Sequence, residues 1–157
     1  MPDQPECPLC NSQAETLVWN AGPCRVILVS DADYPGYCRV VWNEHVAEMT
    51  DLSAPERAVL LDTVCATEAA LRALLQPDKI NLASLGNMVP HLHWHIIPRF
   101  RDDRHYPQAI WGTPQRDGVH RSGPDPHALA QRIAAALNGA PATSIDNQQQ
   151  DRRRSPS

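Results

Sequence analysis

Three histidines alternate with apolar residues at positions 91, 93 and 95 of the chain. In an extended strand, successive side chains point to opposite faces, so His91, His93 and His95 would share one face, with Leu92 and Trp94 on the other. Alternate positions lie about 6.6 Å apart along a strand, so neighbouring rings can engage one phosphate group or one metal ion. Adjacent imidazoles lower one another's pKa and lose hydration when buried. The row therefore indicates a chemical role rather than a purely structural one.

Two chemistries fit such a row. In the first, one imidazole attacks phosphorus and forms a phosphoramidate that water later cleaves, while neighbouring rings and backbone N–H groups hold the phosphate oxygens. In the second, alternating histidines bind a catalytic zinc ion, which lowers the pKa of a bound water molecule. The spacing alone does not decide between them.

A second group of reactive side chains lies near the N-terminus. Cys7 and Cys10 have the two-residue spacing of a zinc knuckle, but the sequence holds no second pair, and a tetrahedral site needs two more ligands. Cys24, Cys38 and Cys65 stand in apolar contexts, so we expect them in the core. An odd number of cysteines in a chain without export features fits a reducing compartment.

Composition narrows the class of protein. The chain has 157 residues, which suits one domain, and its formal net charge is −4, which argues against broad binding to nucleic acid or to an anionic membrane. There is no apolar run long enough for a membrane span, and the N-terminus lacks the profile of a secretory signal. We therefore expect a cytoplasmic protein with a small ligand.

The elements that must position the histidines follow from periodicity. Ser53 and Glu56 form a capping box, with Pro55 in the first turn, and apolar residues then recur at helical spacing over about 54–75. Five apolar runs bounded by turn residues predict strands: Thr16–Trp19, Arg25–Ser30, Tyr37–Trp42, Ile80–Leu85 and His91–Pro98. This order predicts the α+β class, an antiparallel five-stranded sheet with one long helix packed on it.

The same pattern divides the chain into three parts. We expect a catalytic domain with its N-terminal cysteine arm over 1–115, a C-terminal extension over 116–140, and a disordered tail over 141–157. Asp125 and Pro126 begin a short helix within the extension. Three further histidines have polar neighbours and are expected at the surface: His105, His120 and His127.

The run Asn81–Arg99 strongly resembles the signature of the histidine-triad (HIT) nucleotide hydrolases and transferases, in particular their zinc-containing bacterial branch. The likeness extends over roughly residues 5–112. It implies that His93 is the nucleophile that attacks the α-phosphorus of a nucleotide, and that His95 holds a phosphate oxygen. A histidine at this third position resembles the hydrolase branches, since the uridylyltransferase branch carries Gln there.

The resemblance also suggests residues that bind substrate. Asn87 would contact the phosphate and Gly86 would allow the backbone to approach it closely, although both also suit an ordinary turn. Asp31 would bind the ribose hydroxyls, or simply begin a turn. Asn81 is a weaker match, and Ile27 is a candidate contact for the base.

Two positions need separate mention. Met88 stands where many relatives carry Ser or Thr that contacts phosphate, and Met cannot donate a hydrogen bond. Trp111 falls where some relatives place an aromatic side chain near the active site.

For the cysteine pair, the resemblance implies that His45 and His91 complete a structural zinc site with Cys7 and Cys10. Such a site would tie the N-terminal arm to the catalytic strand. The alternative is a reduced pair without metal. No catalytic metal is expected.

The leading hypothesis is therefore a nucleotide phosphohydrolase that acts through a nucleotidyl-His93 intermediate. Its substrate would be a purine nucleotide, either a nucleoside phosphoramidate or a dinucleoside polyphosphate, and the resemblance implies a homodimer. The alternatives are a metal-dependent hydrolase that uses all three histidines and a non-catalytic nucleotide-binding module.

Overall fold

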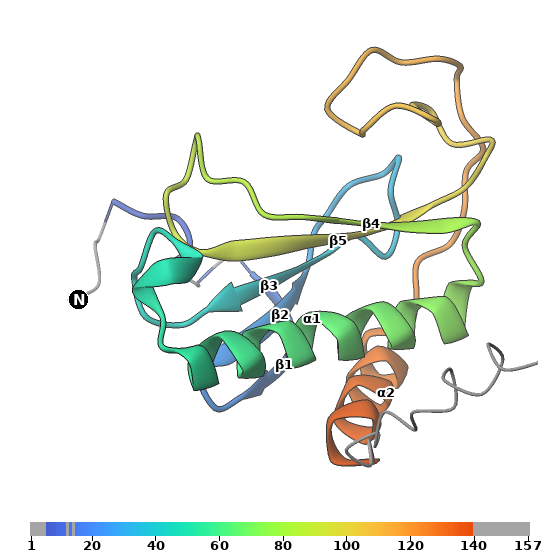
Figure 1. Cartoon of the computed structure of the whole chain (residues 1–157). Coiled ribbons are helices and arrows are strands. Elements are labelled where there is room, and N and C mark those ends of the chain that lie inside the picture. The colour runs from blue at the N-terminus through green and yellow to red at the C-terminus, as the bar shows by residue number, and fades with distance from the viewer. Residues whose placement is uncertain (1–5, 12, 14, 140–157) are drawn as a thin grey trace, which may run out of the picture.

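The structure is a computed structural model and describes residues 6–11, 13 and 15–139 (Figure 1). The predicted tail over 141–157 lies outside the described residues. The described part forms these elements: β1 (Thr16–Ala21), β2 (Cys24–Leu28), β3 (Cys38–Trp42), the 3₁₀ helix η2 (Met49–Asp51), α1 (Ala54–Leu75), β4 (Lys79–Ala83), β5 (His93–Arg99) and α2 (Pro126–Gly139). No helix in this part of the chain is both long and apolar enough to cross a membrane.

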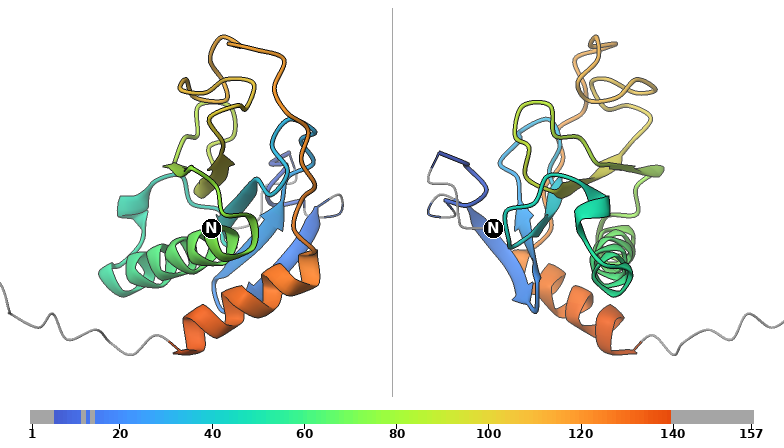
Figure 2. Two further views of the ribbon diagram at one scale, coloured as in Figure 1. Left: turned by 90° about the vertical axis from the view of Figure 1, so that its right-hand side faces the viewer. Right: turned by 60° about the vertical axis from the view of Figure 1, so that its left-hand side comes forward.

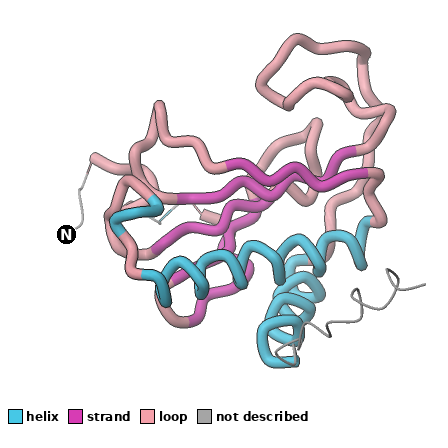
Figure 3. Tube along the Cα trace, in the orientation of Figure 1, coloured by secondary structure: helices cyan, strands magenta, loops and turns pink. Residues whose placement is uncertain are grey.

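The strands form one antiparallel sheet in the order β1-β2-β3-β5-β4 (Figures 1 and 3). β5, which carries the central histidines, lies between β3 and β4 and is therefore hydrogen-bonded on both sides. The predicted fold class, a five-stranded antiparallel sheet with one long helix, is confirmed.

Helix α1 forms where the sequence predicts it, because its two ends carry strong local signals. Ser53 accepts a hydrogen bond from the backbone N–H of Glu56, and the Glu56 side chain accepts one from the backbone of Ser53 in return. The helix ends at Leu75 and is capped by Gln76, whose left-handed conformation (φ 49°) precedes Pro77. The residues that α1 buries against the sheet recur at helical spacing and include Leu60, Val64, Thr67 and Leu71.

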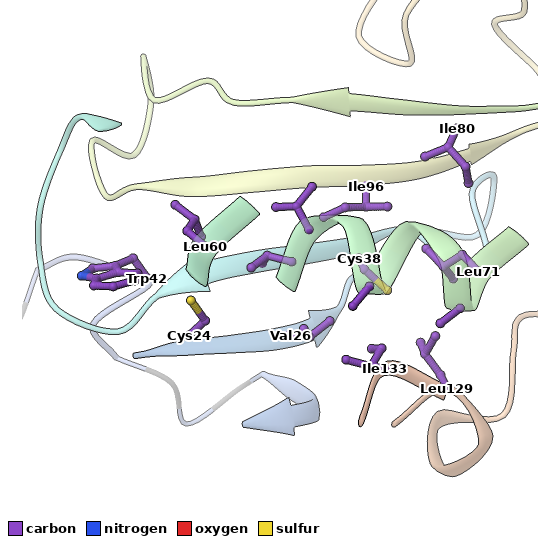
Figure 4. Close-up of a cluster of buried hydrophobic side chains, with 14 of the residues drawn as sticks. Cys24, Val26, Cys38, Trp42, Leu60, Leu71, Ile80, Ile96, Leu129 and Ile133 are labelled. Atoms are coloured by element: carbon purple, nitrogen blue, oxygen red, sulfur yellow. The ribbon is translucent and has the colours of Figure 1, made fainter. Parts of the chain in front are cut away.

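The alternation of side chains along the strands separates two faces of the sheet. One face packs against α1 and forms the apolar core, with contributions from Val26 of β2, Cys38 of β3 and Ile96 of β5 (Figure 4). The intervening positions of the same strands lie on the opposite face. There Ile27 pairs with Arg39, and Arg39 pairs with His95. The side chains that can do chemistry therefore lie on the face away from α1.

Helix α2 is part of the same core. It lies beside α1 and β1 (Figure 2), and its Leu129 and Ile133 are completely buried in the main apolar cluster. Asp125 caps the helix by accepting a hydrogen bond from the backbone N–H of Ala128 at 2.8 Å.

Some expectations need correction. The fifth strand begins at His93 rather than His91, because the backbone N–H of Leu92 donates instead to the carbonyl of Val46, in the loop after β3. Cys65 is exposed, since it follows Val64 on the outer side of α1. His105 is buried rather than exposed, and its Nδ1 lies 2.5 Å from the hydroxyl of the buried Tyr34.

Two adjacent leucines of α1 test the packing. Leu60 is fully buried and Leu61 is 40% exposed. We expect Leu60→Ala to lower the free energy of unfolding by about 2–5 kcal/mol, because it removes buried methyl groups and leaves a cavity. Leu61→Ala should change it by only about 0.5 kcal/mol. Urea denaturation of both variants measures the difference, and equal losses would contradict the burial pattern.

Candidate active site and metal cluster

His93 and His95 lie side by side on the polar face of β5. Their ring centroids are 4.8 Å apart with an interplanar angle of 77°, and the two side chains are only 6% and 5% exposed. Trp94, between them, belongs to the opposite face and packs against the main core. The strand therefore brings two of the three predicted histidines into one partly enclosed site.

The ring of His93 is held in a defined tautomer. Its Nδ1 lies 2.6 Å from the backbone carbonyl oxygen of His91, and only a protonated Nδ1 can donate to that oxygen. Burial lowers the pKa of His93, so the ring is neutral near pH 7. Nε2 then carries the lone pair, which is the state a nucleophile requires.

His95 is oriented by a tyrosine. Its Nδ1 lies 2.5 Å from the hydroxyl of Tyr37, and burial raises the pKa of Tyr37 so that this hydroxyl stays protonated. The pKa of His95 is lowered to about 4 by burial and, to a smaller extent, by His93 and Arg39. Because a neutral His95 accepts at Nδ1 from Tyr37, its Nε2 bears the hydrogen and can donate to an oxygen of a ligand.

His91 points elsewhere. Its Nε2 lies 2.6 Å from the carbonyl oxygen of Trp42, and its Nδ1 lies 3.5 Å from the sulfur of Cys7 and 3.5 Å from that of Cys10. Both ring nitrogens are thus directed away from the His93–His95 pair. This orientation argues against a single metal ion held by all three histidines.

A four-residue cluster instead surrounds the ring of His91. One ligand atom from each of four side chains lies within 4.8 Å of the others, and the members are Cys7, Cys10, His45 and His91. The sulfur of Cys10 also lies 3.3 Å from Nδ1 of His45. Zinc bonds of about 2.0 Å to nitrogen and about 2.3 Å to sulfur, at tetrahedral angles, place such atoms about 3.5 Å apart. The donor set and its spacing therefore fit a zinc ion.

Packing and hydrogen bonds support the arm that carries the cysteines. Cys7 and Leu9 are buried against Ile27 and Val41 on the polar face of the sheet. The Arg25 guanidinium donates to the carbonyl of Leu9 and forms a buried ion pair with Glu15 at 2.8 Å. The arm thus covers one end of the face that carries His93.

The predicted nucleotide-binding residues lie in different settings. Asp31 follows β2, accepts a hydrogen bond from the backbone N–H of Asp33, and lies close enough to raise the pKa of Tyr37. Asn81 accepts a hydrogen bond from Arg99 at 2.7 Å, so its side chain already has a partner. Ile27 is only 5% exposed.

The predicted phosphate-binding residues lie in the loop between β4 and β5. Gly86 and Asn87 line a small surface hollow. The hydroxyl of Ser84 donates a hydrogen bond to the carbonyl of His93 at 3.0 Å, which joins the loop to β5. Gly86 has no positive φ angle, and an added Cβ would meet only ordinary contacts. Turn geometry therefore does not explain this glycine. Met88 is 95% exposed.

Trp111 approaches the site from the C-terminal side. Its ring packs edge-on against His95, with centroids 5.0 Å apart, and the residue is 52% exposed. Its exposed part is available to a ligand bound beside His95.

Sequence reasoning missed Tyr37 and Arg39. Arg39 lies in β3 and Tyr37 directly before it, and the antiparallel register with β5 brings both close to His95. The signal that could have found them is their two-residue spacing in a predicted strand, which places both side chains on one face. The sequence did not reveal which strand would be the neighbour.

Comparison with known proteins gives one family. The HIT domain matches residues 11–102, which is more than half of the chain. No match is found among curated proteins.

Several solved structures are similar to this chain. A histidine triad protein from Bradyrhizobium japonicum is 28% identical, covers 82% of this chain and 91% of its own, and superposes with a TM-score of 0.61. A histidine triad protein from Sinorhizobium meliloti is 26% identical, covers 80% of this chain and 91% of its own, and superposes with a TM-score of 0.63. A zinc-bound histidine triad family protein from Mycobacterium smegmatis shares the fold. It is 22% identical, covers 85% of this chain and 94% of its own, and superposes with a TM-score of 0.54.

The titration of His95 tests the electrostatics of the site. Because its pKa in the folded protein is about 4, below the ordinary 6.5, the unfolded chain binds this proton more readily. His95 therefore contributes stability that is present above pH 6.5 and is lost as the pH falls towards 4. We expect an NMR titration of the His95 ring to give a midpoint well below 6.5, and His95→Gln to weaken the acid dependence of unfolding over that range. A midpoint at 6.5 would contradict this description.

Proposed function

The chain belongs to the HIT domain family, and on that premise we propose that it is a nucleotide hydrolase that cleaves at the α-phosphate through a covalent intermediate on His93. The observation that carries the proposal is the hydrogen bond from Nδ1 of His93 to the carbonyl of His91, which leaves Nε2 as the free lone pair beside a second neutral imidazole. A structural histidine in an apolar strand has no need of this arrangement.

In the first step, the Nε2 lone pair of His93 forms a bond to the α-phosphorus while the bond from phosphorus to the leaving nitrogen or oxygen breaks. The leaving group takes up a proton from solvent. The Nε2–H of His95 donates to a non-bridging phosphate oxygen, which stabilises the charge that gathers there in the transition state. Tyr37 keeps His95 in the tautomer that can do so.

In the second step, a water molecule attacks phosphorus from the side that the leaving group has vacated. Its hydroxyl joins phosphorus, its other proton is released, and the electron pair of the N–P bond returns to Nε2 of His93. The products are a nucleoside monophosphate and the protonated leaving group, and the enzyme returns to its initial state.

We assign the substrate to the purine nucleotides that carry a labile α-phosphate bond, namely nucleoside phosphoramidates and dinucleoside polyphosphates. Asp31 would bind the ribose hydroxyls, and its nearness to the Tyr37–His95 pair supports this. Gly86 and Asn87 would hold the phosphate from the β4–β5 loop, and the absence of a conformational need for Gly86 favours a close backbone approach. Ile27 and Asn81 would contact the nucleotide only if their present neighbours move.

A trapping experiment tests the mechanism. After brief reaction with adenosine 5′-phosphoramidate and acid-free denaturation, mass spectrometry should find one adenylyl group on a peptide containing His93. His93→Ala should lose both the adduct and turnover, by at least about a thousandfold, because no other nucleophile replaces it. His120→Ala, which changes an exposed histidine, should retain both. Turnover that a chelator abolishes, without any adduct, would favour the metal-dependent alternative, and unchanged turnover by His93→Ala would refute the assignment.

We further propose that the four-residue cluster holds one structural zinc ion. The ligand spacing supports this, as does the zinc bound by the M. smegmatis protein of the same fold. Bound zinc would hold the two cysteines as thiolates and fix the ring of His91, whose carbonyl orients His93. The zinc supplies structure here, and His93 and His95 perform the reaction.

Cysteine variants test the zinc proposal. The purified protein should contain about one zinc ion per chain by atomic emission, and Cys10→Ser should contain nearly none and melt more than about 5 °C lower, since metal binding stabilises the folded state. Cys65→Ser, at an exposed position of α1, should leave both values unchanged. Equal zinc content in the two variants would contradict the site.

We also propose a homodimer that pairs through the β4 side of the sheet. β4 is an edge strand, and Leu82 within it and Leu85 just after it are 40% and 50% exposed. A free edge with apolar side chains is a surface that association can cover.

A further inference from the structure

Three arginines lie on the polar face of the sheet, in neighbouring strands. Two of them are buried and fully engaged. Arg25 of β2 forms its ion pair with Glu15, and Arg99 of β5 forms an ion pair with Asp103 at 2.7 Å and also donates to Asn81. This is the usual condition of a buried cation, which needs a counter-charge to offset its lost hydration.

Arg39, the arginine of β3, differs from both. It is half-buried, and within the described part of the chain no acidic side chain lies within ion-pair distance of its guanidinium. Its Nε is buried and has no hydrogen-bond partner. A buried N–H without a partner is unfavourable, so the protein retains here one donor that no described residue satisfies.

The position of Arg39 explains what can satisfy it. Arg39 is directly opposite His95 in the β3–β5 ladder, where paired Cβ atoms are about 5 Å apart. Its guanidinium lies over the ring of Tyr37, 5.7 Å from the centroid. The charge of Arg39 also contributes to lowering the pKa of His95.

The site also lacks positive charge of its own. Burial lowers the pKa of His95 to about 4, so near pH 7 this ring carries no charge that could balance a phosphate. Lys79 is the single lysine of the chain, and its ammonium donates to the carbonyl of Ile80 at 2.8 Å. An anion bound beside His93 would therefore meet Arg39 as its nearby cation.

We propose that Arg39 binds the non-bridging oxygens of the substrate's α-phosphate, and so selects anionic phosphate ligands over uncharged nucleosides. The proposal rests on the proposed function, because it places the phosphate at His93. A guanidinium is permanently charged and can donate two parallel hydrogen bonds to one phosphate. Tyr37 supports the guanidinium from one side, and His95 donates to the same phosphate from the opposite strand.

Ligand binding tests this without requiring turnover. Isothermal titration calorimetry would compare AMP with adenosine on the wild-type protein, Arg39→Gln and Arg39→Lys. We expect Arg39→Gln to weaken AMP binding by roughly ten- to a hundredfold, and adenosine binding by less than about twofold, because only AMP carries the charge. Arg39→Lys should recover part of the loss, since it restores the charge without the paired donors.

Arg72→Gln is the matched control, because Arg72 is an exposed arginine of α1, on the other side of the sheet. It removes the same charge and should leave the affinity for AMP unchanged. Melting curves of each variant show whether the fold is retained.

Two results would overturn the proposal. One is an Arg39→Gln protein that binds AMP as tightly as the wild type, and the other is an equal loss for AMP and adenosine, which would mean a structural role. Failure of the proposed function is distinguishable, because that depends on the adduct at His93. A missing adduct together with a selective loss of AMP binding would refute the hydrolase and keep the phosphate site. An adduct on His93 together with unchanged AMP binding by Arg39→Gln would keep the hydrolase and refute the phosphate site.

Discussion

One hydrogen bond, from Nδ1 of His93 to the backbone carbonyl of His91, connects the two functional parts of this molecule. It fixes which nitrogen of His93 carries the lone pair, and its acceptor belongs to the residue whose ring lies among the two cysteines and His45. His91 is held at both ring nitrogens, by the carbonyl of Trp42 and by the sulfur atoms. The cysteine arm is therefore linked to the orientation of the His93 ring, the proposed nucleophile, through His91.

The sheet makes this arrangement possible by separating its two faces. Side chains on one face pack against α1 and provide the apolar free energy of folding, so the other face is free to carry polar groups. On this polar face, the charges of Arg25 and Arg99 are balanced by ion pairs with Glu15 and Asp103. Both histidines between them are kept neutral by burial, which suits nucleophilic attack but leaves the binding of an anion to other groups.

The sequence alone predicted the features that depend on neighbouring residues in the chain. The capping box gave the start of α1, strand alternation gave the face of His93 and His95, and the histidine motif gave the family. The cluster of Cys7, Cys10, His45 and His91 followed from the resemblance alone, since no spacing rule joins residues so far apart. Tyr37 and Arg39 were missed because their role depends on strand order and register, which long-range packing decides. The roles of Asn87 and Asp31 stay predictions.

The burial of Leu129 and Ile133 extends the folded core beyond the residues that match the family model. The family match ends at residue 102, yet α2, which begins at Pro126, supplies two fully buried side chains to the core between α1 and β1. A fragment cut at the family boundary would expose the apolar surfaces that these side chains cover, and would be prone to aggregate. Expression of the folded part alone therefore requires the chain to run through Gly139, well past the last residue of the family match.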